Sequence, residues 1–143
     1  MPALHILPSS IRGRFNDLGL ESAHALVLSA RKGIKTKVFY EFADTIKMSE
    51  KALAILLNLS SRTISNYKDQ RKSLEPAYSE HLLKLISLFK KGEEIFGTIY
   101  EFNYWLQKPF WNTKERPLDW LITSGGVDLI IEELDRLANA YPA

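Results

Sequence analysis

The sequence predicts an all-α protein with a helical bundle over residues 20–92, a smaller helical unit over residues 93–143 and a flexible N-terminal arm over residues 1–19. Apolar residues recur every three or four positions along most of the chain, whereas no segment shows the strict alternation of a half-buried strand. The charge also differs between the two units. Residues 31–72 hold ten Lys and Arg against four Asp and Glu, and residues 93–143 hold four against nine.

The composition excludes several classes of protein. With 45% hydrophobic and 25% charged residues, the chain is typical of a globular protein with one core or two small ones. It has no cysteine, so it can form neither a disulfide nor a thiolate metal site. The start of the chain lacks the basic residues of a signal peptide, and no apolar run approaches the ~20 residues of a membrane span. We therefore expect a cytoplasmic protein without a membrane partner.

Four helices are predicted before residue 70. The first covers residues 21–32 and ends at Gly33, and the second begins near Thr36, which we expect to be its N-cap. Two short helices follow, because Ser49 and Ser60 both stand where an N-cap is expected. The second helix presents to the core an apolar face made of Phe39, Phe42, Ala43 and Ile46.

The rest of the chain alternates longer helices with turns. The expected elements are a helix over residues 77–91, a helix over 93–107, an irregular stretch over 108–117, a short helix over 117–122 and a last helix over 127–139. The first of these has an apolar face made of Leu82, Leu85, Ile86 and Phe89. We expect it to end at Lys90, Lys91 and Gly92.

Residues 50–69, EKALAILLNLSSRTISNYKD, fit the template of a helix-turn-helix. Small Ala54 stands where the two helices approach most closely. Asn58 occupies the turn, where φ is positive and where asparagine is the best residue after glycine. The inward positions that fix the second helix across the first are Leu53, Leu57, Leu59, Ile64 and Tyr67. The fit favours a helix-turn-helix over an ordinary helical hairpin.

The second helix of such a motif lies in a DNA major groove, with the residues near its N-terminus facing base edges. Arg62 can bond a guanine bidentately and Asn66 an adenine. The basic charge of residues 31–72 agrees with a polyanionic partner. The alternative is a bundle that has kept this shape and lost DNA binding. The predicted DNA contacts are Ser61, Arg62, Thr63, Ser65 and Asn66, with Lys68, Arg71 and Lys72 on the flanking backbone.

Aromatic residues gather in the second unit. Residues 96–120 hold eight of the sixteen aromatic residues, among them all three tryptophans, and a unit of this size cannot bury them all. The residues that helical spacing places in its core are Phe96, Trp105, Leu106 and Trp120. The residues expected on the surface, where aromatic side chains dominate protein interfaces, are Tyr104, Phe110 and Trp111. The second unit therefore predicts a protein partner or self-association.

Several short motifs between Leu26 and Asn139 resemble those of antitoxins of the Xre/MbcA/ParS type. They are ARKGI at 30–34, LxxLLNLSSRTI at 53–64, EEIFG at 93–97, WLQKP at 105–109, RPLDWLITSGG at 116–126 and LDRL at 134–137. In that family an Xre-like helix-turn-helix precedes a small helical toxin-binding domain. The resemblance implies an antitoxin that neutralises a RES-domain toxin acting on NAD, covers the toxin's active site and represses its own operon. The implied partners are the cognate RES-domain toxin, operator double-stranded DNA and further copies of the chain, as a dimer or a higher oligomer.

The resemblance also assigns residues within the toxin-binding domain. It implies that Phe96-Gly97, Trp105-Leu106, Pro117-Leu118 and Gly126 shape the domain, and that the tail from Arg136 onward lies nearest the toxin pocket. Together with the aromatic residues above, the predicted toxin contacts are Tyr104, Trp105, Phe110, Trp111, Trp120, Arg136, Leu137 and Tyr141.

Neither a catalytic site, a metal site nor a cofactor is expected, so the protein is predicted not to be an enzyme. The histidines, His5, His24 and His81, lie far apart without metal ligands at useful spacing. The adjacent carboxylates of Glu93-Glu94 and Glu132-Glu133 point in different directions on a helix, and no glycine-rich phosphate-binding motif occurs. Two alternatives to an antitoxin remain. One is a stand-alone Xre-like transcriptional repressor whose C-terminal unit serves dimerisation, and the other is a scaffold that binds protein but no DNA.

Overall fold

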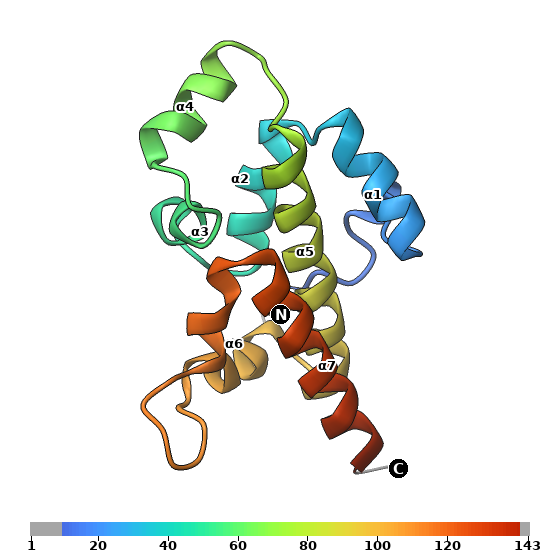
Figure 1. Ribbon diagram of the computed structural model, residues 1–143, viewed down its shortest axis with the longest axis vertical. Coiled ribbons are helices and arrows are strands. Elements are labelled where there is room, and N and C mark those ends of the chain that lie inside the picture. The colour runs from blue at the N-terminus through green and yellow to red at the C-terminus, as the bar shows by residue number, and fades with distance from the viewer. Residues whose placement is uncertain (1–9, 141–143) are drawn as a thin grey trace, which may run out of the picture.

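The computed structural model describes residues 10–140, and over that range the chain is built from helices joined by turns and loops (Figure 1). The predicted all-α class is therefore confirmed. In chain order the elements are the 3-10 helix η2 (Asn16–Leu18), α1 (Ala23–Lys32), α2 (Thr36–Thr45), α3 (Glu50–Leu56), α4 (Ser61–Asp69), α5 (Pro76–Phe96), α6 (Ile99–Gln107), the 3-10 helix η3 (Pro117–Ile122) and α7 (Ser124–Ala140).

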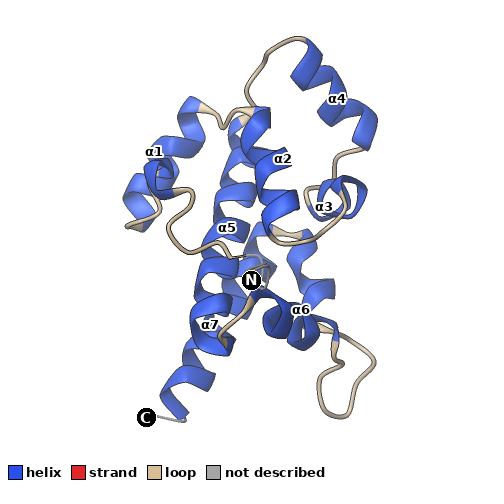
Figure 2. Ribbon diagram, turned by 180° about the vertical axis from the view of Figure 1, so that it is seen from behind, coloured by secondary structure: helices blue, strands red, loops and turns tan. Residues whose placement is uncertain are grey.

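The long helix α5 passes through the middle of the molecule, as Figures 1 and 2 show from opposite sides. Helix α1 packs on one side of it, and α6 and α7 pack around its C-terminal half. Helices α2, α3 and α4 pack on one another beside its N-terminal half. The helix-turn-helix and the C-terminal unit are therefore attached to the two halves of one helix.

Helix α5 extends further than the sequence analysis predicted. It does not end at Gly92 but continues to Phe96, and Gly97, with a φ of 95°, ends it. The expected helix over residues 93–107 is accordingly divided, since Thr98 is the N-cap of α6 and its side chain accepts a hydrogen bond from the Glu101 amide. The expected junction at residues 92 and 93 lies inside α5, so the two units share this helix.

A single apolar core joins the two units. Three of its aromatic rings form a row of edge-to-face contacts. Phe42 from α2 contacts Phe89 from α5, and Phe89 contacts Phe102 from α6. The ring centroids lie 5.6 and 5.0 Å apart, within the range of favourable aromatic pairs. The predicted apolar faces of α2 and α5 are buried in this core, as their spacing required.

The expectation of a flexible arm is wrong for residues 10–19, and residues 1–9 lie outside the described part of the chain. Ile11 is fully buried, and Phe15 packs edge to face on Phe42. The Ser10 hydroxyl donates to Glu93 Oε1 over 2.8 Å, and the Ile11 amide approaches Glu93 Oε2 at 3.2 Å. A buried carboxylate needs such donors, so this short segment is held on α5 although it contains little regular structure.

The last helix begins earlier than expected, at Ser124, so that both glycines of the predicted turn lie in its first turn. Gly126 packs directly against η3, where an added Cβ would stand 1.8 Å from the Trp120 carbonyl oxygen. Trp120 itself is 39% exposed and is therefore not a core residue as predicted, whereas Leu106 is buried and Phe96 and Trp105 are half-buried. Salt bridges from Lys84 to Asp128 and from Lys91 to Asp135 connect α5 with α7.

Candidate functional site

Helices α3 and α4 form the predicted helix-turn-helix. Ser49 and Ser60 are the N-caps, and their hydroxyls accept from the amides of residues 52 and 63, each over 3.0 Å. Ala54 is buried, and Asn58 has the predicted positive φ, at 60°. These local predictions are confirmed, whereas Thr36 is the first residue of α2 and not its N-cap.

Helices α2, α3 and α4 end in the same way. Each closes with a Schellman motif, in which the residue after the C-cap takes a left-handed conformation and two amides bond back to the last turn. Those residues are Lys47, Asn58 and Arg71, with φ of 58°, 60° and 55°. In each motif one hydrogen bond spans five residues. These bonds run from Met48 N to Ala43 O, from Leu59 N to Ala54 O and from Lys72 N to Tyr67 O, over 2.9–3.0 Å. The orientation of α4 is thus fixed at both ends by hydrogen-bonded turns.

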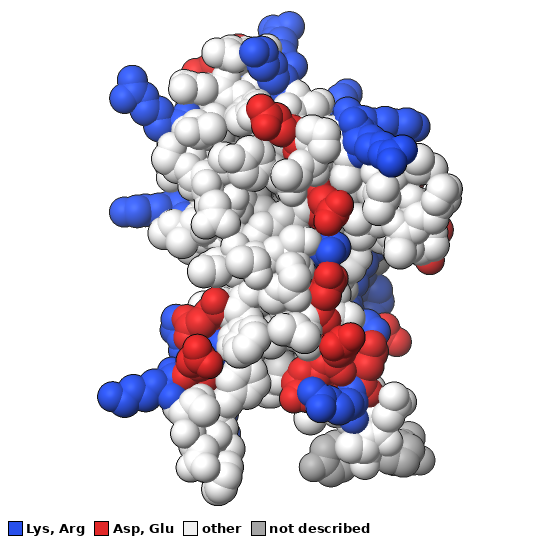
Figure 3. Space-filling view, in the orientation of Figure 1, with Lys and Arg blue, Asp and Glu red and all other residues white. Residues whose placement is uncertain are grey.

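Helix α4 buries one side chain, Ile64, and leaves its other face to solvent. Thr63 is half-buried, where its hydroxyl bonds that of Ser60. The predicted DNA contacts that are exposed are Ser61, Arg62, Ser65, Asn66, Lys68, Arg71 and Lys72. Figure 3 shows several Lys and Arg side chains at the end of the molecule that carries α4. The structure therefore groups these residues on one element and the turn after it, and their contact with DNA stays a prediction.

Tyr40 supports the C-terminal part of α4. The ammonium group of Lys68 lies 4.8 Å from the centroid of the Tyr40 ring, which is the arrangement of a cation–π contact. Burial, followed by the nearby carboxylates of Glu50 and Asp69, raises the pKa of Tyr40 above its ordinary value. The phenol therefore stays neutral, and α4 is connected to α2 by a side chain that the sequence analysis did not identify.

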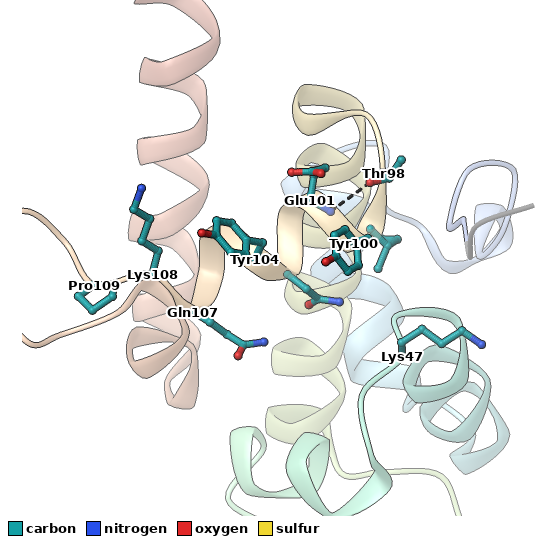
Figure 4. Close-up of a pocket in the computed structure, with 10 residues that line it drawn as sticks. Lys47, Thr98, Tyr100, Glu101, Tyr104, Gln107, Lys108 and Pro109 are labelled. Carbon is teal, nitrogen blue, oxygen red and sulfur yellow. Dashed lines mark hydrogen bonds between the residues drawn. The ribbon is translucent and has the colours of Figure 1, made fainter.

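An exposed groove lies along α6. It measures about 1060 Å³ and is lined by Lys47, Thr98, Ile99, Tyr100, Glu101, Asn103, Tyr104, Gln107, Lys108 and Pro109. Tyr100 and Tyr104 are one helical turn apart and are 74% and 64% exposed. Figure 4 shows both rings on α6 and Lys47 on the turn after α2. The sequence analysis missed Tyr100, although its four-residue spacing from Tyr104 indicates a shared face.

The predicted toxin contacts within residues 10–140 are spread over two hollows, a loop, η3 and α7. Tyr104 lines the groove along α6, and Trp111, which is 87% exposed, lies in the loop that follows this helix. Trp105 and Leu137 line a different hollow of about 540 Å³, together with Ile95, Phe96 and Ala138. Phe110, which was expected on the surface, is half-buried, whereas Trp120 and Arg136 are exposed. Tyr141 lies outside the described residues.

His81 links α5 to η3, and the sequence analysis gave it no role. It is buried, and its Nε2 lies 2.8 Å from the Leu121 carbonyl oxygen. Burial is the largest effect and lowers its pKa below the ordinary value, Lys84 lowers it further, and the hydrogen bond to Leu121 acts in the opposite direction. Neutral His81 therefore donates from Nε2 and holds the C-terminal end of η3 on α5.

Within residues 10–140, no group of three or more His, Cys, Asp and Glu side chains is arranged to hold a metal ion. The helices of this part of the chain include none with the length and hydropathy needed to cross a membrane.

The exposed second helix of a helix-turn-helix is joined through α5 to a helical unit with exposed aromatic residues. The fold is therefore that of a helix-turn-helix protein with a second helical unit. Comparison with known families specifies the class further. Residues 25–87 match the family model of the antitoxin Xre-like helix-turn-helix domain, and residues 91–139 match that of the antitoxin Xre/MbcA/ParS C-terminal toxin-binding domain. No curated protein matches the chain. The two matches follow one another and cover most of the sequence, so the chain belongs to the Xre/MbcA/ParS family of antitoxins, as its motifs predicted.

Proposed function

We propose that the protein neutralises a RES-domain toxin that consumes NAD, and represses its own operon through α4. The observation that carries this proposal is the separation of two exposed surfaces. Helix α4 lies at one end of the molecule, and the loop after α6 lies at the opposite end (Figure 1). One molecule can therefore bind operator DNA and toxin at the same time. In this proposal it acts in the cytoplasm by binding alone and catalyses no reaction.

In the DNA complex, residues 20–92 act as the DNA-binding domain and α4 enters the major groove. Arg62 and Asn66 are exposed on α4 and carry the planar groups that pair bidentately with guanine and adenine. Each such pair contributes about 1–3 kcal/mol of discrimination between bases. Operators read in this way are two-fold symmetric, which favours a dimer or a higher oligomer of the antitoxin.

In the toxin complex, residues 93–143 act as the toxin-binding domain. Exposed tyrosine and tryptophan side chains supply large contact areas at small entropic cost. Within residues 10–140, Tyr104 and Trp111 are the most exposed of the predicted aromatic contacts. The C-terminal end of α7, from Arg136 onward, is the part proposed to lie nearest the toxin's active site. The acidic excess of this unit is suited to a basic toxin surface.

Two double variants separate the two activities. Arg62→Ala with Asn66→Ala is expected to abolish operator binding in a gel-shift titration while co-expression still restores growth and cellular NAD in the presence of a RES-domain toxin. Tyr104→Ala with Trp111→Ala is expected to give the opposite pattern. Each variant is the folding control for the other, because both change only exposed side chains. If a folded variant keeps both operator binding and toxin neutralisation, or loses both, the assignment of the two surfaces is wrong.

The groove along α6 favours a second candidate function. Two exposed tyrosines on one helix face also suit self-association, in which case the protein is a stand-alone repressor that dimerises through its C-terminal unit. Sedimentation of the variant Tyr100→Ala with Tyr104→Ala distinguishes the two candidates. A variant that becomes monomeric, from a wild-type chain that neutralises no toxin, supports the stand-alone repressor, whereas an unchanged oligomer with lost neutralisation supports the toxin interface.

A further inference from the structure

The turn after α4 lies directly against the junction between α1 and α2. The Leu74 amide donates to the Ile34 carbonyl oxygen over 2.8 Å, and Lys35 and Ser73 form an isolated antiparallel bridge. Gly33 permits this approach, because its φ is 87° and an added Cβ would stand 2.9 Å from the Leu74 carbonyl oxygen. The two segments are thus held together by their backbones, independently of the charged side chains that they carry.

These segments bring five cations to one end of the molecule. We call them the junction patch, which consists of Arg31, Lys32, Lys35, Arg71 and Lys72. All five side chains are exposed. None of the salt bridges within residues 10–140 includes one of them. Figure 3 shows Lys and Arg side chains over this end. Like charges held close together without acidic partners repel each other, so the patch costs stability unless an anion is bound.

The backbone at Arg71 is a second, independent observation. Arg71 has a φ of 55° at the end of α4, a position where glycine is usual because an L side chain is strained there. Lys72 follows it and donates to the Tyr67 carbonyl oxygen, which completes the turn. The chain therefore keeps a cation beside α4 at a position where glycine would cost no strain, which agrees with a role of the Arg71 side chain in binding.

We propose that the junction patch binds the sugar-phosphate backbone of double-stranded DNA beside the base pairs that α4 contacts. The patch begins at the residue after the C-cap of α4, so a duplex that lies along this helix passes its cations. Phosphates carry one negative charge each, and arginine binds them bidentately. Residues Arg31, Lys32 and Lys35 thereby extend the DNA interface beyond the helix-turn-helix. This inference rests on the proposed function of α4 in DNA binding.

The salt dependence of DNA binding tests the patch. In the full chain, Arg31→Gln with Lys32→Gln and Lys35→Gln removes three charges without changing Arg71, Lys72 or α4. Because each neutralised phosphate contributes about 0.9 to the slope of log K against log salt, we expect the slope to fall by about 2 to 3. Affinity near ~0.1 M salt should fall by about tenfold or more, equally for operator and unrelated duplexes, because the phosphate contacts are independent of sequence.

The control is Arg12→Gln with Lys114→Gln, which removes two exposed cations outside the helix-turn-helix and outside the groove along α6 and should leave the slope unchanged. Arg71→Gly keeps the left-handed turn and should lower the slope by about 1. If the wild-type chain binds DNA and the triple variant has the same slope, the patch proposal is wrong and the proposed role of α4 stands. If the triple variant instead loses self-association with an unchanged slope, the patch contacts the acidic unit of a second copy, and the proposal is also wrong. A wild-type chain that binds no duplex overturns both proposals.

Discussion

The side-chain amide of Asn58 donates a hydrogen bond to the main-chain carbonyl oxygen of Ile122 over 2.8 Å. Asn58 is the turn residue of the helix-turn-helix, and Ile122 is the last residue of η3 in the toxin-binding domain. One residue therefore meets two requirements, since its backbone takes a positive φ of 60° and its side chain joins the two functional units. The packing of η3 on α3 is a further contact between the two units.

Two substitutions at Asn58 separate these requirements. Asn58→Gly keeps the left-handed backbone and removes the hydrogen bond, which is exposed, so we expect a loss of about 0.5–1 kcal/mol of unfolding free energy. Asn58→Ala removes the bond and also strains the turn, and should cost about 1 kcal/mol more than Asn58→Gly. Urea titrations of both variants measure the difference. Equal losses would mean that the left-handed backbone contributes nothing to the stability of the turn.

His81 predicts a pH dependence of stability. Burial lowers its pKa in the folded chain below the value of the unfolded chain, so the unfolded chain binds more protons at mildly acidic pH. The contribution of neutral His81 is fully present above the unfolded pKa of about 6.5, and is lost as the pH falls from there through the folded pKa. The urea midpoint of the wild type should therefore decrease between about pH 7.5 and about pH 5.

His81→Gln is the control for this prediction. Its side-chain amide can still donate to the Leu121 carbonyl oxygen, as His81 Nε2 does over 2.8 Å, but it does not titrate. The variant should lose less stability than the wild type over the same pH range. If both midpoints decrease equally, other groups dominate the pH dependence, and the assignment to His81 is incorrect.

Lys47 and Arg71 occupy equivalent left-handed positions, with φ of 58° and 55° at the ends of α2 and α4. Glycine adopts this conformation without steric cost, so Lys47→Gly and Arg71→Gly should each raise the unfolding free energy, by up to about 1 kcal/mol. Only Arg71→Gly should also weaken DNA binding, since Lys47 lines the groove of α6 and not the junction patch. Thermal melts and gel shifts of the pair test this, and equal affinities would show that Arg71 does not contact DNA.

The predictions that succeeded concern features encoded by a few neighbouring residues. Ser49 and Ser60 cap α3 and α4 because a hydroxyl beside the first turn needs no distant partner. Asn58 takes its left-handed conformation for a similarly local reason. The family resemblance succeeded because motifs of both domains are present in order, as the two family matches show.

The predictions that failed depend on residues far apart in the chain. Ser10 and Glu93, 83 positions apart, bond to each other and hold a segment whose own sequence favours a flexible arm. Trp120 has the spacing of a core residue but lies on a 3-10 helix, where its ring stays 39% exposed. Neither the length of α5 nor the division between the exposed and half-buried aromatic residues follows from periodicity, because both are decided by packing between α5, α6 and α7.

Gly92 gives the sharpest test of that packing. The sequence analysis placed it at a helix end, but it lies inside α5, where an added Cβ would stand 2.4 Å from the ring of fully buried Phe102. Gly92→Ala should therefore destabilise the chain by about 1–3 kcal/mol, because the ring cannot move without disturbing the core.

Gly125→Ala is the matched control, since nothing lies within 4 Å of its Cβ position in the first turn of α7, and helix propensity predicts a gain of up to about 1 kcal/mol. Phe102→Leu combined with Gly92→Ala should recover part of the loss if the ring is the cause. Urea denaturation of the four chains measures these changes, and a neutral Gly92→Ala would mean that α6 does not pack on α5 at this position.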